Sequence, residues 1–197
     1  MTQLPRGRPR SEATRLAVLT ATAELIAETG YDRVTIEAIA ARAGCGKQTI
    51  YRWWSSKSLI VADAVIDGHL RLPEHGVPDT GDLGADLRDW VTEAAASVRI
   101  PEHRALIRAL AAAASETEAE SLRLSEHLTA PHYGALMRRL RAGQARGQLS
   151  PEANLDAIAD ALLGSTLFRV LAGFPPAAHP SAIVDLLLGA GPGGRSG

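Results

Sequence analysis

The sequence predicts an all-α fold, in which a small N-terminal helical domain precedes a larger C-terminal helical bundle. Glycine and proline divide the 197 residues into long Ala/Leu-rich stretches, and no stretch of strand length alternates apolar with polar residues. Hydrophobic residues make up 46% and charged residues 22%, which is the composition of a globular protein rather than of a disordered chain. The chain is therefore expected to bury a substantial core.

The first two helices are predicted from apolar spacing and from capping residues. Residues 11–29 carry apolar side chains at helical spacing, with Ser11 as a candidate N-cap and Gly30 as the C-terminal stop. The second helix begins after the cap Thr35 and ends at the turn 44–46, which has the sequence Gly-Cys-Gly.

A short third helix is predicted over residues 47–54. Ile50 and Trp54 are four residues apart, so they share one face of this helix, and we expect that face to be buried. Ser55 or Ser56 then caps a fourth helix.

After a linker rich in glycine and proline at 71–84, further helical segments are predicted at 83–98, 101–114, 116–145, 150–171 and 178–188. Pro131 is expected to kink or break the segment in which it lies, because proline removes a backbone hydrogen bond and clashes with the preceding turn. Ser150 is the expected cap of the following helix.

The charges are distributed unevenly, although the net charge of the chain is only −1. Residues 1–57 hold nine basic and five acidic side chains, so the remainder of the chain is acidic. Lys47 and Lys57 are the only lysines, and both fall in this basic part. A basic end joined to an acidic body indicates that a polyanion binds at the N-terminal end.

The second and third predicted helices and the turn between them form a helix-turn-helix. In this motif the second helix lies in the major groove of DNA. Lys47 can reach phosphate or guanine acceptors, Gln48 can form two hydrogen bonds with adenine, and Thr49 offers a hydroxyl and a methyl group. These three residues are the expected base readers.

Tyr51, Arg52 and Lys57 are expected to contact the DNA backbone. Lys57 lies at the start of the fourth helix, where its ammonium and the free backbone N–H groups both favour a phosphate. The alternative for this segment is an ordinary pair of bundled helices with a charged solvent face.

Roughly residues 11–65 resemble the TetR/AcrR family of bacterial transcription regulators. The resemblance is carried by Thr35-Ile36-Glu37-Ala38-Ile39-Ala40, by Ala43-Gly44-Cys45-Gly46-Lys47-Gln48-Thr49-Ile50-Tyr51-Arg52-Trp53-Trp54 and by Lys57. It implies an all-helical homodimeric repressor that binds a palindromic operator in double-stranded DNA and releases it when a small-molecule effector occupies the C-terminal domain. Gly46 and Trp53 depart from the family pattern, where a polar residue and a histidine are common.

The leader Arg6-Gly7-Arg8-Pro9-Arg10 resembles N-terminal arms that enter the minor groove, where arginine senses a narrow width and a negative potential. A disordered, solubilising tail is the alternative. The complete set of expected DNA-contacting residues is Arg6, Arg8, Arg10, Thr35, Lys47, Gln48, Thr49, Tyr51, Arg52, Trp53 and Lys57.

The apolar side chains of the C-terminal body either line a ligand pocket or fill a core. The candidates for pocket walls are Trp90, His103, His127, His132, Tyr133, Met137 and Phe168. The last two helices are apolar over more than one face, so we expect them to pair with a second copy of the chain. The interface residues expected are Leu155, Ile158, Leu162, Leu163, Leu167, Ile183, Leu186 and Leu187.

Other classes of protein lack support in the sequence. Cys45 is the single cysteine and is better explained as a small turn residue than as a redox sensor, and the histidines form no metal-binding pair. No catalytic motif or cofactor signature occurs, so we expect neither an enzyme, a cofactor nor a metal. No apolar run is long enough for a secretion signal or a membrane span, which indicates the cytoplasm. The rival hypothesis is an interaction module that assembles through its C-terminal helices without DNA.

These patterns predict three segments along the chain. Residues 1–57 form a three-helix DNA-binding domain with a basic arm, residues 58–190 form a helical domain for ligand sensing and dimerisation, and residues 191–197 form a disordered tail.

Overall fold

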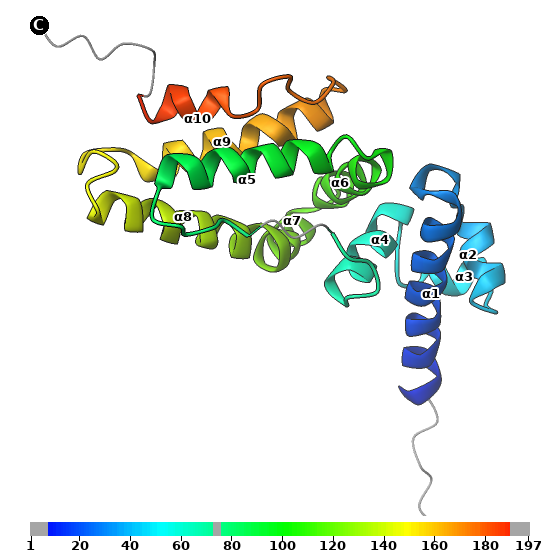
Figure 1. Cartoon of the computed structure of the whole chain (residues 1–197). Helices are drawn as coiled ribbons and strands as arrows, with labels where there is room; N and C mark the ends of the chain where they lie inside the picture. Colours follow the sequence, from blue (N-terminus) through cyan, green and yellow to red (C-terminus); the bar gives the residue numbers. More distant parts are fainter. Residues whose placement is uncertain (1–7, 73–75, 190–197) are drawn as a thin grey trace, which may run out of the picture. The chain divides into compact units, whose positions relative to one another are not determined.

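A computed structural model describes residues 8–72 and 76–189, and within these ranges every regular element is helical (Figure 1). The predicted all-α fold class is therefore confirmed. The chain divides into two compact units, of which the first contains residues 1–72 and 105–124 and the second contains residues 73–104 and 125–197. Helix α6 (Pro101–Ala114) crosses from the second unit into the first.

The first unit contains α1 (Arg8–Thr29), the 3₁₀ turn η1 (Tyr31–Arg33), α2 (Ile36–Arg42), α3 (Lys47–Tyr51), α4 (Lys57–Ile66), most of α6, and α7 (Glu118–Leu124). Helix α1 packs against both α2 and α4. The core of this unit is formed by Val18, Leu19, Ile26, Ile39, Ile50, Trp54, Ile60, Val61 and Leu106.

Local capping interactions set the start of α2 and α4. The Thr35 hydroxyl accepts a hydrogen bond from the Ala38 N–H at 3.1 Å, and the Ser56 hydroxyl accepts one from the Leu59 N–H at 3.2 Å. Both caps agree with the prediction. Helix α1 begins at Arg8 rather than after Ser11, so Ser11 is not its cap; Pro9 is tolerated in the first helical turn because the N–H groups there have no intrahelical acceptor.

The first unit does not end at residue 57, where the sequence placed the domain boundary. Helix α4 lies along α1, and its Ile60 and Val61 are fully buried in the same core. The segment 105–124 joins this core through Leu106. A boundary drawn from composition misses this arrangement, because the contacts join residues that are far apart in the sequence.

Polar contacts reinforce the attachment of the segment 105–124. Asp63 on α4 accepts hydrogen bonds from the indole N–H of Trp54 at 2.8 Å and from the Arg123 guanidinium at 2.6 Å. Glu116 accepts hydrogen bonds from the hydroxyls of Ser55 and Ser58, both at 3.0 Å. The segment that precedes α8 in the chain is thus tied to the helix that follows the helix-turn-helix.

The second unit contains α5 (Leu83–Ser97), the π-helical turn η2 (Ser125–Thr129), α8 (Ala130–Ala145), α9 (Leu155–Leu171) and α10 (Ala182–Leu187). Helices α5, α8 and α9 pack against one another, and α10 packs on α5 and α9 (Figure 1). The core is formed by Leu83, Leu87, Trp90, Val91, Leu136, Met137, Leu140, Ile158, Leu162 and Val184.

Helices α5 and α8 are in close contact at Gly143. A Cβ atom at this position would lie 2.6 Å from Leu83 Cδ2, a distance that real Cβ atoms do not show. Glycine is therefore required here by packing, since any larger residue would displace the buried Leu83.

Three predicted segments in the C-terminal half of the chain also differ from the prediction. Helix α9 begins at Leu155 because Asn154, not Ser150, accepts the capping hydrogen bond from the Ala157 N–H. Helix α10 begins at Ala182 rather than at 178, because Pro180 disfavours helical backbone in the residue before it. The segment predicted at 116–145 is interrupted by η2, and Pro131 lies in the first turn of α8.

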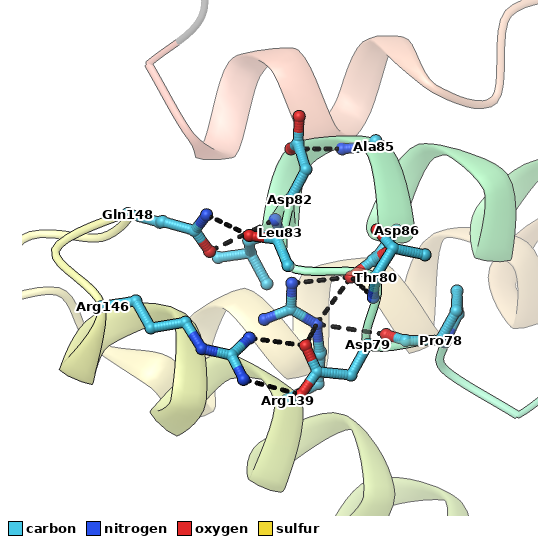
Figure 2. A network of polar contacts seen from close by, with 11 residues as sticks. Pro78, Asp79, Thr80, Asp82, Leu83, Ala85, Asp86, Arg139, Arg146 and Gln148 are labelled. Carbon is cyan, nitrogen blue, oxygen red and sulfur yellow. Dashed lines mark hydrogen bonds and ion pairs between the residues drawn. The ribbon is translucent and has the colours of Figure 1, made fainter.

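A buried ion pair joins α5 to α8 (Figure 2). The side chains of Asp86 and Arg139 are 1% and 2% exposed, and Arg139 donates to Asp86 Oδ2 from Nε at 2.8 Å and from Nη2 at 2.6 Å. Thr80 donates to the same carboxylate from its backbone N–H and its hydroxyl, and Arg139 also donates to the Pro78 carbonyl. The network therefore holds the loop before α5 against α8.

Within residues 8–72 and 76–189, no helix is both long enough and apolar enough to cross a membrane.

Candidate nucleic-acid interface

The turn between α2 and α3 requires glycine at its first position. Gly44 adopts a φ of 65°, in the left-handed region where residues with a Cβ atom are strained. The Cys45 N–H donates to the Ala40 carbonyl at 3.0 Å, and Gly46 is the extended residue before α3. Burial raises the pKa of the Cys45 thiol, which disfavours a reactive thiolate and agrees with a structural role for this residue.

Helix α3 is anchored on one side and exposed on the other. Ile50 is fully buried and Trp54 is 4% exposed, whereas Tyr51 is 54% exposed, and Lys47 and Gln48 are also exposed. The pair expected to form the scaffold thus does so, although α3 ends at Tyr51 and Trp54 is held by a turn bond to the Ile50 carbonyl. The helix presents polar side chains to solvent from a fixed base.

The remaining residues of the predicted interface lie around this helix. Thr49 is half-buried, while Arg52 and Trp53 are exposed in the turn after α3. The Trp53 ring stacks on Trp54 with centroids 5.8 Å apart, which holds Trp53 at the surface. Thr35 is exposed as the cap of α2. The contacts of these residues with DNA stay predictions.

Lys47 has an acidic neighbour that sequence reasoning missed. Its ammonium donates to Glu37 Oε1 at 2.9 Å, and both side chains are more than half exposed. The hydrogen bond raises the pKa of Lys47 and lowers the pKa of Glu37. Glu37 therefore competes with any phosphate or base for the Lys47 ammonium.

Glu37→Gln is expected to strengthen DNA binding several-fold at low salt. The substitution frees Lys47 from its ion pair and removes a negative charge that lies beside it. Electrophoretic mobility shifts at two salt concentrations measure the effect. Glu120→Gln is the control, because it removes a carboxylate that is also paired with a cation, Arg123, in the first unit. Equal DNA affinity of Glu37→Gln and the wild type would contradict the competition.

Lys57 makes contacts within the chain that the sequence did not predict, while its contact with DNA stays a prediction. Its ammonium donates to the backbone carbonyls of Tyr31 and Val34, both at 2.9 Å, and lies 4.0 Å from the centroid of the Tyr31 ring. Burial lowers its pKa. Lys57 therefore fixes the η1 turn in front of α2, and only its third N–H remains for a phosphate. The signal was absent from the sequence, because η1 lies more than twenty residues away.

The basic arm lies only partly within the described residues. Arg6 lies outside the described residues, and Arg8 and Arg10 lie in the first turn of α1. The minor-groove contact stays a prediction.

The second unit contains a pocket of about 260 Å³ between α5, α9 and the loop that connects α9 to α10. It is lined by Val91, Ala95, Val98, Ser165, Thr166, Phe168, Arg169, Pro176, Ala177, His179, Pro180 and Ile183. Of the predicted pocket residues, only Phe168 lines this cavity. The pocket was not predicted because the loop that contains the Pro-Pro pair looks, in the sequence, like a simple connection between two helices.

Three other predicted pocket residues, Trp90, Met137 and Tyr133, lie outside this pocket and contact other groups. Trp90 and Met137 fill the core of the second unit. The Tyr133 hydroxyl donates to Asp156 Oδ1 at 2.7 Å, which raises the pKa of Tyr133 to about 12.

The three predicted pocket histidines also lie outside this pocket. His103 Nδ1 lies 3.1 Å from the Ser97 hydroxyl, and His132 Nδ1 lies 2.6 Å from the Leu128 carbonyl oxygen. His127 is exposed on η2. None of the three lines the pocket of the second unit.

The residues predicted for a dimer interface separate into three groups. Ile158 and Leu162 are buried inside the unit, so they cannot form an exposed contact surface, and their prediction was wrong. Leu155, Leu163, Ile183 and Leu187 are half-buried against the same core, and Leu167 and Leu186 are exposed. On α9 and the loop that follows it, Phe168, Leu171 and Phe174 are also exposed, and they were not among the predicted interface residues.

In the parts of the chain that the structure describes, no group of three or more His, Cys, Asp or Glu side chains is arranged to hold a metal ion.

Both the N-terminal and the C-terminal parts of the sequence match known protein families. Residues 18–64 match the family described as bacterial regulatory proteins, tetR family, and residues 77–189 match the family described as tetracyclin repressor-like, C-terminal domain. The HTH-type transcriptional regulator YdeS of Bacillus subtilis is 33% identical over 172 residues, which cover 86% of this chain and 84% of YdeS. The HTH-type transcriptional regulator Rv1556 of Mycobacterium tuberculosis is 34% identical over 173 residues, which cover 85% and 82% of the two chains.

A solved structure supports the same assignment. The crystal structure of the TetR family transcription regulator SCO0332 has a TM-score of 0.61 and 30% sequence identity, and it covers 90% of this chain and 98% of its own. An exposed recognition helix anchored by Ile50 and Trp54, a helical C-terminal unit, and matches to both family descriptions agree with one another. The chain therefore belongs to the TetR family of helix-turn-helix, DNA-binding transcriptional regulators.

Proposed function

We propose that this protein is a homodimeric repressor that binds a palindromic operator through one helix-turn-helix per protomer and releases the DNA when a small molecule occupies its second unit. It acts in the cytoplasm and catalyses no reaction. The observation that carries the proposal is the surface of α3, where Lys47, Gln48 and Tyr51 are exposed on a helix whose opposite side is locked into the core.

Base recognition is assigned to Lys47, Gln48 and Thr49. They occupy the N-terminal turn of the recognition helix, which in this motif is the part that meets the base edges. Tyr51 and Arg52 follow and contact the backbone, together with Thr35, Trp53 and the basic arm. Backbone contacts fix the position of α3, and base contacts select the sequence.

Dimerisation is assigned to α9. Leu167 and Phe168 precede Leu171 by four and three residues, and the three are exposed by 44%, 62% and 51%, so they form an apolar stripe on one side of the helix. A single protomer reads only half of an operator, and two protomers must be held about 34–36 Å apart to read both halves. An α9–α9 contact would set this distance.

The pocket and the apolar stripe share a residue. Phe168 lines the pocket and is also exposed on the outer side of α9. A ligand in the pocket therefore contacts a side chain of the dimer surface directly. By favouring one packing of Phe168, it can shift the dimer towards a spacing that no longer fits the operator.

The direct test is a mobility-shift assay with the full-length protein and the DNA upstream of its own coding region. Salt-sensitive binding to a pseudo-palindromic site is the expected result, and expression of a reporter from that DNA should fall when the protein is present. Absence of specific binding there, and to sequences selected from a random pool, would overturn the proposal.

Gln48→Ala is expected to relax sequence preference at one base pair of each half-site. The loss of two hydrogen bonds to an adenine should reduce discrimination there by about 1–3 kcal/mol, with little change in the salt dependence. Binding to operators substituted one position at a time measures the effect. Arg52→Ala is the matched comparison, since it should weaken all sequences alike; equal loss of preference in the two variants would contradict the assigned roles.

A further inference from the structure

Among the residues that line the pocket of the second unit, the only formal charge is positive. The apolar side chains of Val91 and Ala95 on α5, and of Val98 directly after it, form one wall, and none of the lining residues is acidic. The polar lining residues are Ser165, Thr166, Arg169 and His179. An apolar pocket with a few polar groups at defined positions is typical of a small-molecule site.

Two arginines contact the loop between α9 and α10 that lines this pocket. Arg169 donates from Nε to the Pro175 carbonyl at 2.8 Å, and Arg99 Nη2 lies 3.5 Å from the carbonyl oxygen of the lining residue Ala177. Phe174 of the same loop packs edge-on against Phe168 with centroids 5.8 Å apart. The loop is thus held by one aromatic contact and by two cations that bind neutral carbonyls.

Neither cation is neutralised within the described part of the chain. There, no carboxylate lies within ion-pair distance of Arg99 or Arg169. Asp185, which follows the lining residue Ile183 by two positions, is already paired with Arg88 at 2.8 Å. A guanidinium carries five N–H donors, so each arginine keeps donors for an anion after its carbonyl contact.

The volume of the pocket limits the size of its ligand. A cavity of about 150 Å³ accommodates benzene, and pockets for drug-sized molecules begin at about 300 Å³. The value of about 260 Å³ therefore corresponds to one ring with a short substituent.

We propose that this pocket binds a small organic anion, namely a carboxylate attached to a single apolar ring, with the ring between α5 and α9 and the carboxylate on Arg169 and Arg99. The inference rests on the proposed function, because it assigns the chemical class of the effector. The arginines supply charge-assisted hydrogen bonds, and Val91, Ala95 and Phe168 supply apolar contact.

Calorimetric titration of the full-length protein with three probes of one shape tests the charge preference. The probes are phenylacetate, its neutral analogue 2-phenylacetamide and the cation phenethylamine. Phenylacetate is expected to bind at least about 10-fold more tightly than the amide, as hydrogen bonds to charged groups predict, and the amine is expected not to bind. Equal or tighter binding of the amide, or no binding of phenylacetate, would overturn the proposal.

Substitutions locate the effect in the pocket. Arg169→Gln is expected to weaken phenylacetate binding about 10-fold while leaving 2-phenylacetamide binding unchanged, and Arg99→Gln should act in the same direction. The control Arg141→Gln removes one positive charge from an exposed position on α8 that does not line the pocket. Ala95→Leu should reduce the affinity of every probe because it fills part of the cavity. Circular dichroism verifies that each variant is folded, and loss of phenylacetate binding in Arg141→Gln alone would place the site elsewhere.

Failure of this inference is distinguishable from failure of the proposed function, because probe binding is measured without DNA. If the protein binds phenylacetate in preference to the neutral and cationic probes but stays bound to its operator when phenylacetate is added, the anion site is supported. Its role in releasing DNA is then contradicted. If the protein binds its operator but does not bind phenylacetate, the proposed function as a regulator is supported and the proposed class of ligand is overturned.

Discussion

Asp86→Ala is expected to lower the free energy of unfolding by about 3–5 kcal/mol, the usual cost of removing one partner of a buried ion pair. The variant leaves the guanidinium of Arg139 buried without its counter-ion, and it also removes the acceptor of the Thr80 N–H and hydroxyl. Chemical denaturation, with the midpoint and slope fitted separately, measures the loss.

A double variant separates the ion pair from general loss of packing. Arg139 Nη1 is buried and has no hydrogen-bond partner, so the pair is not fully satisfied even in the wild type. Asp86→Leu combined with Arg139→Met should therefore recover much of the stability lost in Asp86→Ala. A double variant that is less stable than the single one would show that the charges themselves stabilise the unit.

Asp86 also predicts how stability depends on pH. Burial alone would raise the pKa of Asp86, but hydrogen bonds from Thr80 and Arg139 outweigh it and hold the pKa below the ordinary value of 3.8. Because the folded pKa lies below the unfolded one, this carboxylate stabilises the protein above about pH 4 and loses that contribution as the pH falls further. The stability of Asp86→Asn should therefore decline less steeply than that of the wild type below pH 4, and parallel curves would contradict the assignment.

If the protein is the proposed dimer, Leu171→Glu is expected to convert it to a monomer and to weaken operator binding by about 100-fold or more. The side chain is 51% exposed and makes no contact with the pocket, so a charge there costs little in the separate protomer. In an α9–α9 interface the same carboxylate would be buried without a partner, at a cost of several kcal/mol. Sedimentation measures the mass, and mobility shifts with whole and half operators measure the binding.

Leu122→Glu provides the control, because Leu122 is an apolar residue of α7 that is 60% exposed and lies in the first unit. It should leave the mass unchanged. A Leu171→Glu variant that remains a dimer would place the interface on another surface.

Gly164 supplies a second variant on the same helix. It is exposed in the middle of α9, and its missing Cβ would meet nothing within 4 Å in the protomer. Glycine inside a helix costs about 1 kcal/mol relative to alanine, and no contact within the chain explains that cost. Close approach of a partner helix would explain it, so Gly164→Ala should stabilise the isolated protomer but weaken the dimer.

The predicted recognition helix was accurate because its determinants are local. Thr35 and Ser56 cap helices through backbone N–H groups three residues ahead, and Ile50 and Trp54 share a face because they are four residues apart. The exposed side of α9 was predicted less accurately. When nearly every side of a helix is apolar, as in α9, spacing does not reveal that Leu162 faces inward while Phe168 faces outward.

The sequence by itself determined the helical class, the helix-turn-helix with its exposed and buried sides, and the family, because these depend on residues within one or two turns of each other. Only the tertiary structure decided that Lys57 holds the η1 turn, that Glu37 competes for Lys47, that residues 105–124 belong to the DNA-binding unit, and that the pocket lies between α5, α9 and the following loop. Each of these features joins groups that are ten or more residues apart. Their contact depends on how whole helices pack, and the residues involved carry no local pattern that reports it.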